Sequence, residues 1–492
     1  MLAVAGGALG VVLAELVLSA IPRIGALNLP RAGDIRLDDT VLGFTIGLSV
    51  VSSVLFGLLP SLQASRLDLV NALRASGVAA KPESRAGRGV FGVSTRGLLI
   101  VGQVALSIVL LIGAALLLQS FLRLHSVNPG FQPAHLLTAK IALPPARYDT
   151  DRKKAAFFRA LLPRLQGLPG VRSATMSMSL PGTTWIRTNI LGAEGGKPGG
   201  DQGPEVTPNP VLQSIMPGYF STLGIPLKRG REFTVRDNAP GARPVMMVNE
   251  NLARQLWPDY PEGVNPIGRH VREGYDKAVG WMEVVGIAAD IHEGGLASRA
   301  VPEFYIPCTV HPPQTAYLVV RTAGDPMSYA NAVRKQVLAL DRSQPVSEVR
   351  TMEQVLDATL GQRRLTMWLL GVFAGVALLL AVIGIYGVIA YSVAQRTQEV
   401  GIRMALGAQR GDILWLVVGQ GLVLTLAGVG LGMIGALALT GVMKGLLFGV
   451  SATDPGTFVG VALLFVAVAL LASYLPARRA ARIDPMAALR VE

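Results

Sequence analysis

The sequence is poor in cysteine and in charged residues, and both shortages limit what kind of protein it encodes. Its 492 residues include a single cysteine, Cys308, which excludes an intrachain disulfide and a metal site built from several cysteines. Only 16% of the residues are charged, against about 25% in an average soluble domain, which excludes an ordinary cytosolic enzyme. No basic segment precedes the first apolar run, so we expect no cleavable signal peptide.

Motifs of catalytic and nucleotide-binding sites are also missing. No histidine belongs to an H-E-x-x-H pair, and no G-x-S-x-G elbow is present. Gly196-Lys197 is no phosphate-binding loop, because Leu191 and Pro198 replace the required Gly and Ser or Thr. The segment Asp290–Glu293 offers cation ligands, but we interpret it as a solvated loop. We therefore expect a non-catalytic protein without cofactor or metal.

Apolar residues collect in long uncharged runs, which are typical of membrane-spanning helices. Six runs reach the ~20 residues that a helix needs to cross a bilayer core of ~30 Å. They are residues 2–21, 41–59, 98–118, 366–391, 413–436 and 457–475. The long stretch between the third and fourth runs is polar and rich in Pro and Gly, so it predicts a folded domain in water.

Basic residues predict the orientation of the chain in the membrane. The loops after the second and fourth runs and the C-terminal tail hold more Lys and Arg than the alternate loops. By the positive-inside rule, both termini are cytoplasmic and the large domain is extracytoplasmic. The net charge of +13 is also compatible with nucleic-acid binding, but many of these residues flank the apolar runs. We therefore expect a lipid bilayer as partner and no nucleic acid.

Two segments of the chain repeat each other without gaps. Residues 59–74 and 475–490 are identical at eight of sixteen positions, and each follows an apolar run. The repeated polar residues are Arg66, Asp68 and Arg74 in the first copy and Arg482, Asp484 and Arg490 in the second. A basic helix on the membrane surface explains them, as does a docking or structural role specific to this fold.

The domain in water begins and ends with β-α-β patterns, which predict an α+β fold. Strands are expected at 136–143, 171–178, 316–322 and 346–350, with helices over 150–168 and from Asp325-Pro326 through 340. Strand candidates at 244–248, 282–287 and 303–306 predict a second subdomain, inserted over about residues 180–313. Thr351 and Gln354 form a capping box that starts a helix leading toward the fourth run.

Residues 395–409, between the fourth and fifth runs, predict a short amphipathic helix. Arg396, Glu399 and Arg403 share one helix face, and Val400 and Met404 supply apolar contacts. Such a helix lies on the membrane surface or docks into a partner's groove, and its periodicity leaves both open. In the fourth run, Gly371-x-x-x-Gly375 predicts close helix packing, within the chain or at a subunit interface.

The phrase R-T-Q-E-V-G-I-R-M-A-L-G-A at 396–408 resembles the cytoplasmic signature of the MacB/FtsX-like ABC transporter permeases. Residues 217–233 and 475–490 resemble the extracytoplasmic domain and the C-terminal ending of that family. The resemblance implies a permease that borrows a separate ABC ATPase and moves its outer domain for export by mechanotransmission. It also implies dimerisation with itself or another permease, and a periplasmic adaptor. The elbow, residues 392–412, would couple to the ATPase through Arg396, Glu399, Gly401, Arg403, Ala405 and Gly407.

The internal repeat is further similar to that of duplicated permeases from Acidobacteria. It implies a remnant of a first permease unit over 1–90 and the first helix of a complete FtsX-like unit over 91–124. A MacB-like core domain would follow over 125–365 and the rest of the FtsX-like unit over 366–492. On this pattern we expect an N-terminal truncation. A signalling or scaffold protein that controls, for example, a cell-wall hydrolase and a nonfunctional truncated permease remain alternatives.

Overall fold

The computed structural model describes residues 95–480 except 184, 185, 189, 197–208, 274–279, 396, 444 and 446. Before residue 95 it describes only 6–8, 10–12, 14–16, 38–40, 42–47, 49–51 and 54. The chain divides into two compact units. Residues 124–360 form one, called the outer domain below, and the segments before and after them form the other, called the membrane unit.

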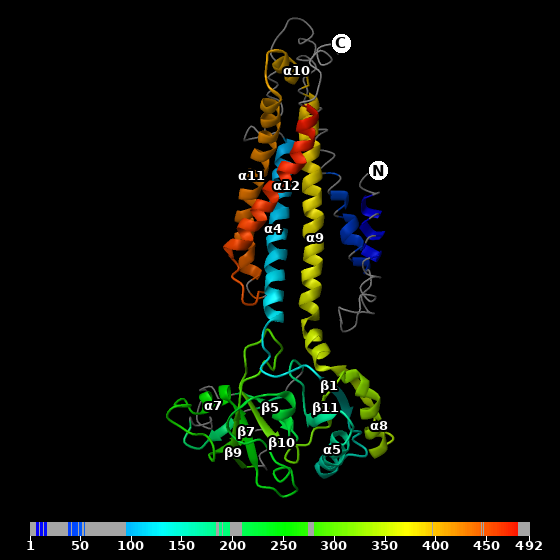
Figure 1. The fold of residues 1–492 in the computed structure, drawn as a ribbon, viewed down its shortest axis with the longest axis vertical. Coiled ribbons are helices and arrows are strands. Elements are labelled where there is room, and N and C mark those ends of the chain that lie inside the picture. The colour runs from blue at the N-terminus through cyan, green and yellow to red at the C-terminus, as the bar shows by residue number, and fades with distance from the viewer. Residues whose placement is uncertain are drawn as a thin grey trace. The chain divides into compact units, whose positions relative to one another are not determined.

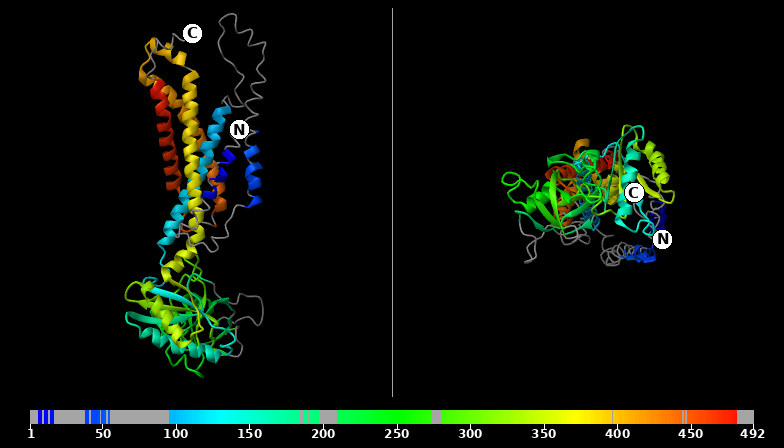
Figure 2. Two further views of the ribbon diagram at one scale, coloured as in Figure 1. Left: turned by 90° about the vertical axis from the view of Figure 1, so that its right-hand side faces the viewer. Right: turned by 90° about the horizontal axis from the view of Figure 1, so that it is seen from below.

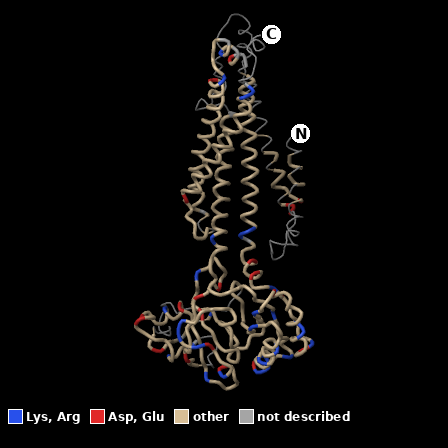
Figure 3. The backbone as a smooth tube through the Cα atoms, in the orientation of Figure 1, with Lys and Arg blue, Asp and Glu red and all other residues tan. Residues whose placement is uncertain are grey.

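Four helices among the described residues are long and apolar enough to cross a membrane. They are α4 (Thr95–His125), α9 (Met352–Gln395), α11 (Arg410–Met443) and α12 (Pro455–Ala480). They confirm the third to sixth predicted runs, and Figure 3 shows them almost without charged residues between their ends. The first two predicted runs fall largely outside the described residues, so a total of six spans stays a prediction.

The four helices lie side by side in the membrane unit and share one apolar core (Figures 1 and 2). Polar contacts also join them, and two of these start from α4. The Ser107 hydroxyl of α4 donates to the Ala377 carbonyl of α9 at 2.9 Å, and the Gln119 amide donates to the Thr457 hydroxyl of α12 at 2.9 Å. In an apolar surrounding, such bonds satisfy polar groups that would otherwise lack a partner.

Glycines let α11 approach α4 closely. A Cβ atom added at Gly432 would lie 2.8 Å from the Ala105 carbonyl oxygen, and one at Gly428 would lie 2.7 Å from the Val104 Cβ. Only residues without a side chain permit this approach. By contrast, a Cβ at Gly371 or Gly375 meets nothing within 4 Å. No described residue thus packs on these two glycines, and their predicted role in close helix packing, within the chain or at a subunit interface, stays a prediction.

The outer domain is built on one sheet that contains all twelve strands of the described residues, in the order β12-β1-β11-β2-β5-β10-β7-β9-β8-β4, with β3 beside β5 and β6 beside β9 (Figure 1). The strands are β1 (Leu136–Ala142), β2 (Val171–Ser177), β3 (Ile186–Arg187), β4 (Ile190–Ala193), β5 (Val211–Ile215), β6 (Leu227–Gly230), β7 (Val245–Asn249), β8 (His270–Glu273), β9 (Trp281–Ala288), β10 (Glu303–Pro307), β11 (Thr315–Thr322) and β12 (Val346–Thr351). Its helices are α5 (Asp151–Gln166), α6 (Tyr219–Leu223), α7 (Glu250–Leu256), η4 (Pro326–Tyr329) and α8 (Ala330–Leu340).

The two predicted β-α-β patterns are confirmed, and they interleave. β11 lies between β1 and β2, and β1 lies between β12 and β11, with antiparallel pairing throughout. This is the strand order of a ferredoxin-like β-α-β-β-α-β unit. α5 and α8 cover its apolar core.

The predicted second subdomain over about residues 180–313 is not confirmed as a separate unit. β2 pairs with β5 through Ser177 and Ile215, so the sheet continues from one group of strands into the other. One core also draws on both groups, because it joins Leu136 and Val319 to Met247 and Tyr305. Pairing with β5 covers the edge that β2 would otherwise expose.

The helix α9 begins in the outer domain at the predicted capping box. The Thr351 amide donates to the Gln354 side chain at 3.1 Å, and the Gln354 amide donates to the Thr351 hydroxyl at 3.2 Å. Met352 and Leu356 are buried in the outer-domain core. From Arg363 onward the same helix qualifies as a membrane span. One uninterrupted helix of 44 residues therefore belongs to both units.

Candidate functional site: the elbow between two membrane helices

The elbow carries a short helix, α10 (Thr397–Ala405), between α9 and α11. Val400 is 3% exposed and clusters with Ile413 of α11, while Val393, Met404 and Ala408 pack around them. Val400 and Met404 are four residues apart, so they occupy the same face of α10. The predicted amphipathic helix is thus present, and its apolar face is seated on the ends of the neighbouring helices.

A fixed C-terminal cap ends α10. Gly407 has a φ of +101°, a left-handed conformation that favours glycine. Its amide donates to the Met404 carbonyl at 3.1 Å, and the Ala408 amide donates to the Arg403 carbonyl at 3.0 Å. These two bonds are the pattern of a Schellman motif. The Gln409 amide then donates to the Asp412 carboxylate at 3.0 Å at the start of α11. The turn from α10 into α11 is therefore held in one conformation.

The outward face of α10 combines a charged pair with exposed apolar side chains. Glu399 and Arg403 form an ion pair at 2.7 Å, with both side chains nearly half exposed. Ile402 is 44% exposed and Leu406 is 82% exposed. An exposed ion pair contributes at most about 1 kcal/mol to folding. The pair therefore contributes little to the stability of the fold.

The other predicted site residues of the elbow and of the repeated segments are only partly described. Gly401 and Ala405 are part of α10. Arg396 lies outside the described residues, as do all six polar residues of the repeated segments. The docking role of those segments stays a prediction. The six are Arg66, Asp68, Arg74, Arg482, Asp484 and Arg490.

The polar segment after β9 is not the solvated loop predicted from sequence. Asp290 accepts a hydrogen bond from the Asn251 amide at 2.9 Å, and the His292 ring lies 2.6 Å from the Ser298 carbonyl. Glu293 has 0% exposure. Sequence reasoning also missed Glu303, which is 1% exposed at the start of β10. Among the described residues, no group of three or more His, Cys, Asp or Glu side chains is placed to hold a metal ion.

The membrane unit contains an apolar groove of about 410 Å³ between α9 and α12. Arg479 of α12 donates a hydrogen bond of 3.2 Å to the hydroxyl of Tyr386 of α9. The groove therefore has a polar contact beside apolar walls. Its lining residues are Val382, Ile383, Tyr386, Val468, Leu471, Ala472 and Leu475.

Two protein-family models match successive parts of the chain. The model described as FtsX-like permease C-terminal matches residues 371–485, which include the elbow. The model described as MacB-like periplasmic core domain matches residues 98–340. Together they cover most of the outer domain and at least part of each of the four apolar helices, but not residues 341–370.

Individual relatives are ABC transporter permeases. The uncharacterized permease YknZ of Bacillus subtilis is 28% identical over 297 residues, which are 57% of this chain and 70% of that protein. The pyoverdine export ATP-binding/permease protein PvdT of Pseudomonas aeruginosa is 28% identical over 54% of this chain and 40% of its own length. The macrolide export ATP-binding/permease protein MacB of Rhodospirillum rubrum is 29% identical over 57% and 43%, respectively. The chain thus spans less than half the length of these two fused proteins.

Among solved structures, the periplasmic region of MacB from Actinobacillus actinomycetemcomitans is similar to this chain. The two are 14% identical, with a TM-score of 0.32, over 47% of this chain and 95% of that one.

Proposed function

Because this chain belongs to the MacB- and FtsX-like family of ABC transporter permeases, we propose that it is a transmembrane subunit driven by a separate ABC ATPase. In this proposal, both termini are cytoplasmic and the outer domain faces the periplasm. ATP hydrolysis moves the elbow, and the outer domain responds by mechanotransmission to export a substrate. The chain itself performs no chemistry.

The observation that supports this proposal best is the continuity of α9. Its last residue, Gln395, is followed closely by α10, and its first turns are anchored in the outer-domain core. A helix resists bending because each turn is hydrogen-bonded to the next. A displacement imposed on α10 therefore has a stiff element through which to reach the outer domain.

The proposed ATPase contact is the outward face of α10. Leu406 and Ile402 would enter an apolar groove of the ATPase, and Glu399 and Arg403 would pair with charges at its rim. Burying a leucine completely is worth roughly 1.5–3 kcal/mol. That energy corresponds to about ten- to hundredfold in affinity, so Leu406 alone would decide whether the complex survives purification.

We further propose a second permease as partner. Gly371 and Gly375 lie on α9, and no atom of the described residues comes within 4 Å of a Cβ added at either glycine. Close contact through small residues is a common mode of helix association in membranes. We place the contact with a second copy or another permease there.

The test is co-purification of the full chain with candidate ABC ATPases, followed by an ATPase assay with and without the permease. We expect stable association and an altered turnover rate. Leu406→Glu should abolish association, because it places a charge in the apolar contact. Val235→Glu is the matched control, because Val235 is 80% exposed in the outer domain and should leave binding unchanged. Equal binding by both variants would contradict the assigned contact.

A further inference from the structure

Two neighbouring glutamates are buried in the outer domain, and one carboxylate oxygen of each has no hydrogen-bond partner. Glu293 lies in the segment between β9 and β10, and Glu303 begins β10. One oxygen of each carboxylate is bound. The Gln213 amide donates to Glu293 at 2.8 Å, and the Tyr305 hydroxyl donates to Glu303 at 2.8 Å. The other oxygen of each carboxylate has no hydrogen-bond partner, and neither has the buried Tyr219 hydroxyl.

The titratable groups around this pair add negative charge, and only neutral groups donate hydrogen bonds to it. Each carboxylate acts on its partner, Asp290 adds to the repulsion at Glu303, and the other titratable neighbours are the hydroxyls of Tyr219 and Tyr305. Among the described residues, no Lys or Arg forms an ion pair with either glutamate. An ion left unpaired in a protein interior costs several kcal/mol, so two adjacent carboxylates do not both stay charged there.

Burial and mutual repulsion therefore favour the protonated form. Burial raises the pKa of Glu293 to about 7. Burial, and next the charge of Glu293, raise the pKa of Glu303 well above its ordinary value. A proton on an unpaired oxygen removes one charge and so lowers the cost of burying the pair. The two unpartnered carboxylate oxygens, one on each glutamate, are the atoms at which a proton would bind.

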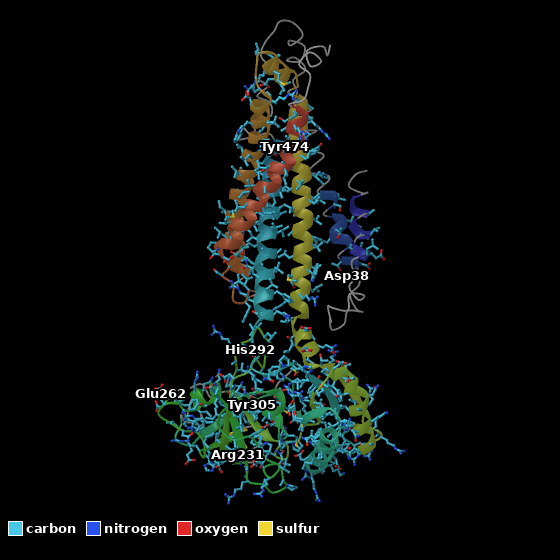
Figure 4. The ribbon with its side chains drawn as sticks, viewed as in Figure 1. Asp38, Arg231, Glu262, His292, Tyr305 and Tyr474 are labelled. Atoms are coloured by element: carbon cyan, nitrogen blue, oxygen red, sulfur yellow. The ribbon has the colours of Figure 1, made fainter. Side chains whose placement is uncertain are left out.

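The pair lies beneath the contact that holds the first turns of α9. The Gly182 amide donates to the Glu293 carbonyl at 2.8 Å. A Cβ at Gly182 would lie 3.0 Å from the Thr359 methyl group, and one at Gly295 would lie 3.6 Å from the Thr359 hydroxyl. Leu356 shares a core with Tyr219 and Tyr305. Figure 4 shows His292, the neighbour of Glu293, and Tyr305 on β10 in the outer domain.

We propose that Glu293 and Glu303 form a proton-binding site that fastens the first turns of α9 to the outer domain. When the site is protonated, its loop packs against α9. When the site loses its proton, repulsion and the need for water loosen the loop and release the helix start. The site needs only the outer-domain geometry, so it stands independently of the proposed ATPase.

The sign of the pH dependence follows from proton linkage. We call the loop closed when it packs against α9 and open when it is released. In the open state the pKa of each glutamate returns to its ordinary value of 4.5. In the closed state both glutamates stay protonated at higher pH. The contact between the loop and α9 is therefore most stable at a pH below the ordinary pKa of glutamate. It weakens as the pH rises from there through the raised pKa values. Each proton released on opening increases the opening equilibrium about tenfold for each pH unit.

Hydrogen exchange of the full chain in lipid nanodiscs tests this site. The amides of residues 352–360 are followed at about pH 5.5 and about pH 6.5, with the chemical exchange rate divided out. Between these two pH values, we expect the opening equilibrium of this segment to increase about tenfold for each proton that opening releases. The double variant Glu293→Gln with Glu303→Gln should lose this pH dependence, since glutamine imitates the protonated acid. Glu262→Gln, at an exposed position of the same domain, should retain it.

Infrared difference spectroscopy gives the second readout, because it detects the carbonyl band of a protonated carboxylic acid. The band should be present at about pH 6.5 in the native chain and in Glu262→Gln, and absent from the double variant. A native chain without pH-dependent exchange, or a double variant with the native slope, overturns the proposal. So does protection at high pH that Ca²⁺ restores only in the native chain, since the pair would then be a cation site.

Discussion

Gly432→Ala tests the close approach of α11 and α4 with a single methyl group. The added Cβ would lie 2.8 Å from the Ala105 carbonyl oxygen, 2.9 Å from the Ile108 Cβ and 3.0 Å from the Ala105 Cα. Optimal carbon contacts lie at about 3.5–4.0 Å. Two of the three neighbours are backbone atoms, so no side-chain rotation relieves the overlap and the helices must separate. Overpacking of this kind destabilises a protein by about 1–3 kcal/mol.

Gly430→Ala is the matched control. Gly430 lies two residues away on the same helix, and an added Cβ there meets nothing within 4 Å. Both variants change glycine to alanine within α11, so the gain in helix propensity, up to about 1 kcal/mol in water, is shared. The difference between the two variants therefore isolates the contact with α4.

Equilibrium unfolding of the full chain in mixed micelles, with helicity as the readout, measures this difference. Gly432→Ala should unfold at a lower denaturant concentration than the native chain, by about 1–3 kcal/mol of unfolding free energy. Gly430→Ala should equal or slightly exceed the native chain. Equal losses in both variants would refute the packing argument, because the two positions differ only in what lies opposite them.

Two further predictions concern the ends of the long helix α9. The double variant Glu399→Ala with Arg403→Ala should reduce ATPase stimulation while membrane insertion is unchanged, because the exposed ion pair contributes at most about 1 kcal/mol to folding; unchanged stimulation would count against the coupling role. Thr351→Ala removes the hydroxyl that accepts a hydrogen bond from the Gln354 amide. It should destabilise the first turn of α9 by about 1 kcal/mol, which is measured as roughly fivefold faster amide exchange in that turn. Thr351→Ser should retain the cap.

Local patterns in the sequence predicted many of the elements correctly. Four apolar helices, the β-α-β patterns at both ends of the outer domain and the capping box at Thr351 are present where the sequence predicted them. The reason is that hydropathy, side-chain periodicity and capping act within one element. The amphipathic α10 belongs to the same class, since Val400 and Met404 are neighbours on one helix face whatever surrounds it.

Tertiary structure alone decided which of several similar patterns makes a contact. Gly371-x-x-x-Gly375 and Gly428-x-x-x-Gly432 share one spacing, yet only the second faces another helix of this chain among the described residues. The segment around Glu293 is polar in sequence and was interpreted as solvated, but the fold encloses it between β5, β10 and the start of α9. In both cases the sequence determines which groups an element carries. What lies opposite them depends on residues far away in the chain, and that distant neighbour sets whether a glycine packs or a carboxylate keeps its proton.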